Sequence, residues 1–405
     1  MKKKQSDETR NSVKFTAVII FIVVTFAILE GVSRVAYEYR DDLKRLTTTF
    51  MKQNIMNGLS LDPYEIPATD IPGHWRLRPG FRATNTEIAE AKKNAGKVLG
   101  VAALKGLPNK GMEDNEPELT INSLGFKGPE IELKSNRVRV LMLGDSVTFG
   151  FGSLSYPRVV EKWLNGMGRP VDVINAGVEG YSPINTVYEF PRYLKLKPDI
   201  VTIYLGWNSL FSIDQVETPY ERIVRSVWLL HRVWYLLTVL IEDPKTRAKI
   251  LYSRALTPDL KEAKSMVADG YVPAFIKDIK TLIDGFQSKD IKVVILTLPG
   301  LFSTAEVPTE KALKKGHLPE FTTNPYVLAR LSEQYNIALR ALAGAQGVQV
   351  MDLEKWGVEE LQPRDQYFSD SVHLTSQGLE KVGQKIATEL LPMIKGNFKN
   401  RAPDE

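Results

Sequence analysis

The stretch VRVLMLGDSVTFGFG, residues 138–152, contains an apolar run that ends abruptly in small and polar residues. A run of alternating valine, leucine and methionine predicts a buried β-strand over residues 138–144. Gly144, Asp145 and Ser146 then form a turn, because glycine, aspartate and serine are the residue types that turns prefer. Such a turn can bind phosphate, connect two elements, or expose one serine.

Phosphate binding is the weakest of these interpretations. Gly144, Gly150 and Gly152 lead towards a predicted helix, as in a phosphate-binding loop. However, the stretch lacks the Gly-Lys-Ser/Thr ending of a P-loop, and its glycine spacing is not that of a dinucleotide-binding fingerprint. The choice between a plain turn and an exposed serine depends on the rest of the chain.

Short apolar strands alternate with helices from residue 138 onward. The pattern predicts strands over 138–144, 171–177, 199–208, 291–300 and 348–353, and helices over 156–167, 183–194, 274–287, 324–345 and 375–394. This alternation indicates an α/β protein with a parallel sheet that is covered on both faces. In such sheets ligands bind beyond the carboxyl ends of the strands.

Polar residues gather at these strand ends in a pattern typical of acyl transfer. A serine hydroxyl becomes a nucleophile when a neighbouring imidazole takes its proton, and a carboxylate must orient that imidazole. Ser146 follows the first strand, and Asp370 precedes His373 by three residues in the loop FSDSVHLT. Preorganised donors must also stabilise the oxyanion. The backbone N–H groups of Ser146 and Gly177 and the side-chain amide of Asn208 are the candidates.

The chain resembles the SGNH (GDSL-type) hydrolase superfamily over residues 138–393. The resemblance rests on four motifs in the family's order: Gly-Asp-Ser, a later glycine, Gly-x-Asn and Asp-x-x-His. The resemblance implies a flavodoxin-like three-layer α/β/α sandwich with a five-stranded parallel sheet. It also implies a catalytic triad of Ser146 as nucleophile, His373 as base and Asp370 as its acid. Ser146, Gly177 and Asn208 would then form the oxyanion hole. We interpret Asp145 as a structural residue that holds the turn.

Composition excludes several other classes of function. The 405 residues contain no cysteine, which removes disulfides and thiolate catalysis. The net charge of +5 comes from interspersed acidic and basic residues, so no nucleic-acid partner is expected. Neither His74, His231 nor His317 has the spacing of a metal ligand, so we expect no metal, and no cofactor.

The N-terminus predicts an uncleaved membrane anchor. Lysines 2–4 precede an uncharged apolar run over residues 15–29, and no signal-peptidase site follows. A cleaved signal peptide and a buried core helix are the alternatives. We therefore expect a protein of the bacterial cytoplasmic membrane, with its catalytic domain outside the cytoplasm. The predicted segments are 1–36 (cytoplasmic end and transmembrane helix), 37–137 (stalk and irregular extension with short strands), 138–395 (hydrolase domain with an insertion at 209–273) and 396–405 (tail).

The predicted function is a serine esterase or acyltransferase that acts on O-acyl esters. The anchor and the segment NSLGFKGPE, residues 122–130, resemble membrane-anchored bacterial members linked to surface-polysaccharide modification. The expected substrate is therefore an acylated cell-surface glycan. Two alternatives stay open: a lysophospholipase or thioesterase that uses the apolar segment 228–241, and a non-catalytic envelope scaffold.

Overall fold

The computed structural model describes residues 21, 24–32, 62–71, 74–98, 119–211, 255–319 and 321–395. Four sequence-based predictions concern segments outside these ranges, either wholly or for the most part. They are the stalk at 37–57, the insertion at 209–273 apart from its two ends, the apolar segment at 228–241 and the tail at 396–405. These four stay predictions.

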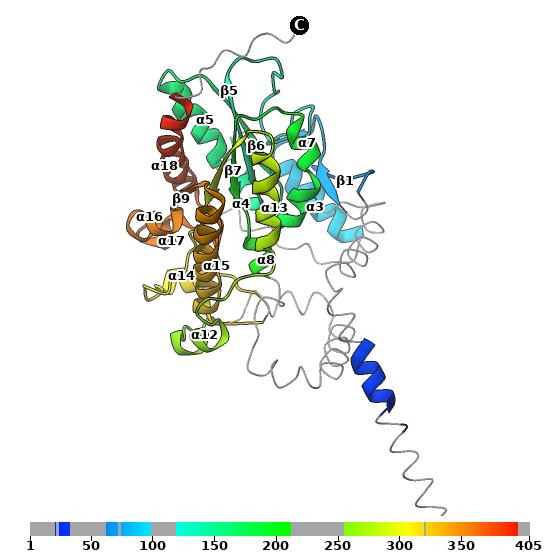
Figure 1. Ribbon diagram of the computed structural model, residues 1–405, viewed down its shortest axis with the longest axis vertical. Helices are drawn as coiled ribbons and strands as arrows, with labels where there is room; N and C mark the ends of the chain where they lie inside the picture. The colour runs from blue at the N-terminus through cyan, green and yellow to red at the C-terminus, as the bar shows by residue number, and fades with distance from the viewer. Residues whose placement is uncertain are drawn as a thin grey trace, which may run out of the picture.

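A five-stranded parallel sheet forms the centre of the molecule (Figure 1). Its strands lie in the order β6-β5-β7-β8-β9, and each neighbouring pair is parallel. All seven residues of β5 are buried, as expected for a continuous apolar run between two helical layers. The α/β architecture predicted from the sequence is thus confirmed. The bounds are β5 Val138–Gly144, β6 Val171–Gly177, β7 Ile200–Tyr204, β8 Lys292–Leu296 and β9 Gln349–Met351.

Helices cover both faces of the sheet (Figure 1). Helices α5 and α18 pack against each other on one face, and α6, α13 and α15 pack together on the other. This division follows from right-handed crossovers that run from β5 to the edge strand β6 on one side and towards β7, β8 and β9 on the other. The bounds are α4 Ser146–Phe149, α5 Tyr156–Gly166, α6 Pro183–Tyr188, α7 Phe190–Leu194, α8 Trp207–Leu210, α12 Leu260–Met266, α13 Ile276–Gln287, α14 Glu310–Lys315, α15 Pro325–Gln346, α16 Leu353–Glu360, α17 Arg364–Tyr367 and α18 Ser376–Lys395.

The helix predicted over residues 183–194 is two helices, α6 and α7. They are separated at Glu189, and Pro191 is the second residue of α7. Proline has no backbone N–H, so it cannot donate to the carbonyl of Val187, and an uninterrupted helix would lose this bond. The other four predicted helices are confirmed, with ends shifted by no more than two residues.

The extension before β5 forms two short antiparallel pairs and one helix. Its elements are β1 (Glu65–Pro67), β2 (Trp75–Leu77), β3 (Arg82–Ala83), α3 (Asn85–Val98) and β4 (Leu119–Thr120). A second hydrophobic cluster joins the extension to the sheet domain, and includes Tyr64 and Trp75 from the extension with Phe149, Val178 and Tyr181 from the domain. The extension therefore packs on the loops that follow β5 and β6.

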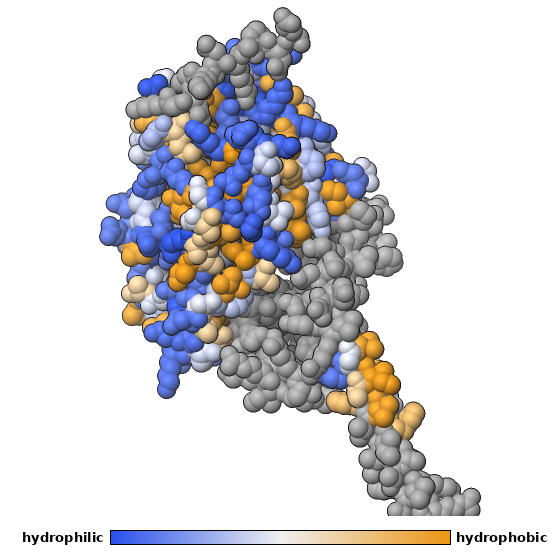
Figure 2. Space-filling view, in the orientation of Figure 1, coloured by the Kyte–Doolittle hydropathy of each residue, from blue (hydrophilic) through white to orange (hydrophobic). Residues whose placement is uncertain are grey.

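Residues 24–32 form a helix near the N-terminus, and its apolar side chains are exposed (Figure 2). The exposed residues include Phe21, Ile28 and Val32. Much of the apolar run at 15–29 lies outside the described residues. Among the helices that are described, none combines the length and the apolar character needed to cross a bilayer.

Candidate active site

The turn after β5 presents Ser146 as the first residue of the short helix α4. Asp145 caps this helix, because its Oδ1 atom accepts the N–H of Val147 at 3.0 Å. Gly144 allows the chain to fold tightly here, since a Cβ atom at this position would lie 1.8 Å from Oγ1 of Thr148. The interpretation of Asp145 as a residue that holds the turn agrees with this geometry.

The loop after α17 presents His373 and orients it through Asp370. Oδ1 of Asp370 accepts the backbone N–H groups of Val372 at 2.9 Å and His373 at 2.8 Å. Its other oxygen, Oδ2, lies 2.7 Å from Nδ1 of His373. The N–H of Ser369 donates to the carbonyl of His373 at 2.8 Å and closes the loop. The carboxylate therefore holds both the backbone and the imidazole ring.

The structure brings these two segments together, although 227 positions separate Ser146 from His373. Nε2 of His373 lies 2.8 Å from Oγ of Ser146. An ionised carboxylate only accepts hydrogen bonds, so Nδ1 of the neutral imidazole must donate to Asp370. Nε2 is then an acceptor, and the Ser146 hydroxyl donates to it. This is the proton arrangement that a serine nucleophile requires.

The electrostatics of the pair support this arrangement. Burial of Asp370 favours its neutral form, but the charge and hydrogen bonds of His373 outweigh burial and lower its pKa to about 2. Burial of His373 likewise opposes its charged form, yet the Asp370 carboxylate raises its pKa above the ordinary value. Asp370 is therefore ionised at neutral pH and stabilises a protonated imidazole.

Asn208 lies on α8, beside the loop that follows β6. The helix begins after Gly206, whose φ of +140° is a conformation that glycine adopts without strain. Nδ2 of Asn208 donates to the carbonyl of Tyr181 at 2.9 Å. One amide hydrogen therefore holds the loop at 178–181, and Nδ2 carries a second hydrogen.

Gly177 does not offer the free N–H that the sequence suggested. Its N–H donates to Oδ1 of Asn175 at 2.9 Å. A Cβ atom here would lie 2.3 Å from the backbone nitrogen of Phe149, so glycine is needed for packing against α4. The prediction that Gly177 contributes to an oxyanion hole therefore needs correction: the residue lets α4 approach β6.

Gly180, three residues further on, was missed from the sequence. It has a φ of +74°, and its N–H has no acceptor within the described part of the chain. It precedes Tyr181, whose carbonyl accepts from Asn208. The signal that could have pointed to it is the second glycine in NAGVEGYS, residues 175–182.

The N-terminal extension supports the Gly180 loop from the other side. Nε1 of Trp75 donates to the carbonyl of Glu179 at 3.2 Å, and the Tyr64 hydroxyl donates to the Glu179 side chain. Nε2 of His74 lies 2.9 Å from the Tyr181 hydroxyl and 3.0 Å from Oε1 of Glu189. His74 is therefore a buried structural histidine.

A second histidine lies beside Asp370. Nδ1 of His317 is 3.9 Å from Oδ1 of Asp370, and its ring packs against Phe211 at 5.1 Å. Ser371 holds it in place, because its Oγ accepts the His317 N–H at 3.0 Å. Burial lowers the pKa of His317, against the opposing charge of Asp370. Nothing in the sequence spacing indicated this neighbour, since 53 positions separate it from Asp370.

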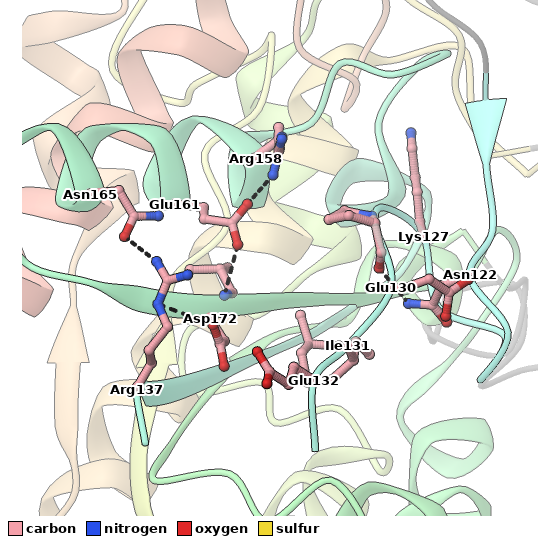
Figure 3. A pocket seen from close by; sticks show the side chains of 13 residues that line it. Asn122, Lys127, Glu130, Ile131, Glu132, Arg137, Arg158, Glu161, Asn165 and Asp172 are labelled. Carbon is pink, nitrogen blue, oxygen red and sulfur yellow. Dashed lines mark hydrogen bonds and ion pairs between the residues drawn. The ribbon is translucent and has the colours of Figure 1, made fainter. Parts of the chain in front are cut away.

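A cavity of about 330 Å³ lies along the outer edge of β6 (Figure 3). It is strongly polar, and its arginines are paired: Arg137 with Asp172 at 3.3 Å, and Arg158 with Glu161. None of the predicted site residues lines it. The cavity is therefore separate from the serine site.

One group of acidic side chains is close enough to share a cation. Within the described ranges, Asp62, Glu65 and Glu179 offer carboxylate oxygens that lie within 4.8 Å of one another. All three residues are half-buried. Acidic residues often gather in this way without binding a metal, so their proximity alone does not define a site. The expectation of no metal stays a prediction.

The fold and the site define an acylhydrolase of the α/β class. A family model described as the GDSL-like Lipase/Acylhydrolase family matches residues 142–381, which is more than half of the chain. The chain belongs to this family. The matched range begins inside β5 and ends inside α18, so it includes Ser146, Asp370 and His373. A search of curated proteins found no match.

Solved structures with a similar fold include two bacterial hydrolases. A lipase/acylhydrolase from Enterococcus faecalis is 19% identical, with a TM-score of 0.38; the match covers 66% of this chain and 99% of that one. Axe2, an acetylxylan esterase from Geobacillus stearothermophilus, is 16% identical, also with a TM-score of 0.38. That match covers 66% of this chain and 98% of the Axe2 chain.

Proposed function

We propose that the protein is a serine acylhydrolase or acyltransferase whose nucleophile is Ser146. The observation that carries this proposal is the continuous chain of hydrogen bonds from Ser146 through His373 to Asp370, with donor–acceptor distances of 2.8 and 2.7 Å. Membership of an acylhydrolase family gives the class of bond that is attacked, an ester.

In the first half of the reaction, Ser146 Oγ attacks the ester carbonyl carbon while Nε2 of His373 takes the hydroxyl proton. The carbonyl π electrons move to oxygen and give a tetrahedral oxyanion. The C–O bond to the alcohol then breaks, and the imidazolium returns its proton to the departing alkoxide. The products are an acyl-enzyme on Ser146 and a free alcohol.

Three donors are proposed for the oxyanion: the N–H of Ser146, the N–H of Gly180 and the second amide hydrogen of Asn208. The N–H groups of Ser146 and Gly180 have no acceptor in the described part of the chain. The first belongs to the nucleophile itself, at the start of α4, and the second precedes Tyr181, whose carbonyl accepts from Asn208. Gly180 takes the place in this proposal that the sequence suggested for Gly177.

In the second half, His373 takes a proton from water or from a sugar hydroxyl, which attacks the acyl carbon. Collapse of the second tetrahedral intermediate releases Ser146 and returns the proton to its oxygen. Water yields a carboxylic acid, and an alcohol yields a new ester. Hydrolysis and transfer therefore use the same residues.

The proposed substrate is an O-acyl ester of a cell-surface glycan. Support comes from the basic and apolar N-terminus and from the NSLGFKGPE segment, which together resemble membrane-anchored bacterial members. In the same proposal, residues 1–36 hold the hydrolase domain, residues 138–395, on the outer side of the cytoplasmic membrane. Protease treatment of intact spheroplasts tests the topology: the C-terminal domain should be digested, and its protection would overturn the proposed location.

The activity is tested with the full chain and a short-chain nitrophenyl ester. Ser146→Ala should lower kcat by at least about 10³-fold, because no other group can form the acyl-enzyme. Ser288→Ala, at an exposed serine far from the site in the sequence, is the matched control and should keep full activity. Equal rates for Ser146→Ala and the unchanged protein would exclude Ser146 as nucleophile.

A series of esters with increasing acyl length tests the substrate class. Preference for acetyl supports a glycan ester, because glycan O-acyl groups are short. Preference for long acyl chains would contradict this and indicate a lipid substrate. Loss of all ester activity in a folded protein would favour a scaffold instead.

A further inference from the structure

A buried lysine lies directly behind the serine turn. Lys127 is 6% exposed and belongs to the segment NSLGFKGPE, which precedes the region matched by the family. Its backbone forms an antiparallel bridge with Asn175 of β6. Figure 3 shows its side chain extending away from Glu130 and Asn122, so its ammonium group leaves the polar cavity that its stem lines.

The ammonium group of Lys127 contacts the carbonyl end of α4. Its Nζ atom donates to the carbonyl of Phe149 at 2.6 Å and lies 3.5 Å from the carbonyl of Leu154. It also lies 4.3 Å from the centre of the Phe149 ring. Carbonyl groups in the last turn of a helix have no partners within the helix, and a cation there is favourable.

Asn175 reaches the same place from the neighbouring strand. Its Nδ2 atom lies 2.9 Å from the carbonyl of Thr148 and 3.4 Å from that of Phe149. Two donors that are paired through their backbones therefore converge on the last residue of the helix that begins with Ser146. The other end of α4 is capped by Asp145.

No carboxylate in the described part of the chain forms an ion pair with Lys127. Burial lowers the pKa of Lys127 to about 7, against the opposing charge of Glu179. Burial of an ammonium group costs free energy, and the carbonyls of Phe149 and Leu154 offset part of that cost. Because these acceptors lie at and just beyond the end of the helix that begins with Ser146, the lysine is placed to act on the serine turn.

The chain after α4 forms a tight turn, in which the N–H of Phe151 donates to the carbonyl of Leu154 at 2.9 Å and the N–H of Leu154 donates to the carbonyl of Phe151 at 2.7 Å. Gly150 has a φ of +73° and Gly152 a φ of +49°, and glycine restricts the backbone least of all residues. Between them lies Phe151, whose ring centre is 5.8 Å from that of His373. A donor that binds the carbonyls of Phe149 and Leu154 connects both ends of this glycine-rich segment.

We propose that Lys127 is a positioning residue of the serine site. By holding the carbonyl end of α4, it keeps Oγ of Ser146 within hydrogen-bond distance of Nε2 of His373. It also keeps Phe151 against the imidazole. This proposal rests on the proposed function, because it concerns the reactivity of Ser146.

The test uses the full chain with Lys127→Met, an apolar side chain of similar length. We expect kcat to fall roughly 10- to 100-fold, because small displacements of reacting groups have effects of this size. KM should not change. The rate at which a fluorophosphonate labels Ser146 should fall by the same factor, since this rate reports serine reactivity without the ester. The melting temperature is measured beside both rates, because methionine leaves the carbonyls of Phe149 and Leu154 without this donor.

Two further variants make the result decisive. Lys127→Arg keeps a cationic donor and should recover most of the labelling rate. Lys134→Met, at an exposed lysine seven positions away, should behave as the unchanged protein. If Lys127→Met does not fold, the fluorophosphonate labelling rates of Lys127→Arg and Lys127→Gln are compared instead. Both variants must have the same melting temperature, and the proposal requires a higher rate for the arginine variant.

Three outcomes would overturn the proposal. They are an unchanged kcat and labelling rate in Lys127→Met, a rise in KM alone, and equal labelling of the arginine and glutamine variants. None of these three outcomes contradicts the proposed function, provided that Ser146→Ala is inactive. If Ser146→Ala is as active as the unchanged protein, the proposed function itself fails, so the two failures are distinguishable.

Discussion

The carboxylate of Asp370 accepts its backbone hydrogen bonds from its own loop, whereas the carbonyl end of the turn that carries Ser146 is bound by side chains from distant parts of the chain. In the loop, every backbone bond to the carboxylate of Asp370 spans three residues or fewer. The carbonyl end of the serine turn instead depends on Lys127 and Asn175, which are 22 and 26 positions from Phe149. The orientation of Asp370 within its loop is therefore set by neighbouring residues, and the position of the carbonyl end of α4 is set by tertiary contacts.

This difference indicates how each half of the site should respond to change. A substitution in the loop can remove chemistry while the loop keeps its shape, because an isosteric residue can keep the local hydrogen bonds. A substitution around the turn changes geometry, because its supports are parts of the sheet and of the extension. Substitutions in each half of the site, and the pH dependence of the reaction, test this contrast.

Asp370→Asn should lower kcat by roughly 10³- to 10⁴-fold, because the amide cannot fix the imidazole tautomer as a carboxylate does. Its side-chain oxygen can still accept the N–H groups of Val372 and His373, so the melting temperature should change little. Asp370→Ala removes these acceptors too and should also lower the melting temperature. Steady-state kinetics and thermal unfolding of both variants measure this. Equal loss of stability in both would show that the loop is not held locally.

Gly177→Ala should lower both activity and stability. The added Cβ would lie 2.3 Å from the backbone nitrogen of Phe149, so α4 must move away from β6. Overpacking of this kind costs about 1–3 kcal/mol, and displacement of the nucleophile should lower kcat by about 10²-fold. Gly166→Ala is the matched control, since nothing lies within 4 Å of its Cβ. Full activity of Gly177→Ala would contradict the packing role found for this glycine.

The pH dependence of kcat/KM should reflect His373. Burial lowers the pKa of His373, but Asp370 outweighs this effect and raises the pKa above 6.5. The neutral imidazole is the base, so kcat/KM rises with pH through this pKa, and the acidic limb lies above pH 6.5. In Asp370→Asn the raising effect is lost, so the residual activity should show a limb at lower pH. Rates between about pH 5 and pH 9 measure the shift; a limb that stays or moves upward would contradict it.

Asp145→Asn should have the smallest effect, a change in stability together with a lower pKa of His373, because the Asp145 carboxylate is one of the charges that raise that pKa. Burial raises the pKa of Asp145 to about 6, against the opposing effects of the Val147 N–H and of the charge of His373. Because the folded-state pKa is raised, ionisation destabilises the folded protein as pH rises from about 4 to 6. Asparagine caps helices as well as aspartate does. The variant should therefore melt about 2–4 °C higher at pH 8, with a smaller gain at pH 4. Equal gains at both pH values would contradict this.

Much of the fold could be predicted from the sequence because its signals are short-range. The five strands are short segments rich in apolar residues, and Pro191 shows why one predicted helix is two. The chemistry of the site was also readable, since serine, aspartate and histidine occur at strand ends in a recognisable order. The sequence does not show which backbone N–H groups already donate hydrogen bonds within the protein. Gly177 ends β6 and Gly180 lies three residues further on, and only the structure shows that the N–H of Gly177 is already bonded to Asn175.

The α/β class, the acylhydrolase family and the Asp-x-x-His loop can all be recognised from the order of the residues, because apolar runs and hydrogen bonds across a few residues depend on neighbouring positions. Folding of the whole domain, in contrast, sets which groups surround the serine. It placed Lys127 behind α4, His317 beside Asp370 and Trp75 on the Gly180 loop. The physical reason is that each of these contacts joins segments more than 20 positions apart. Their distances are set by packing of the whole domain.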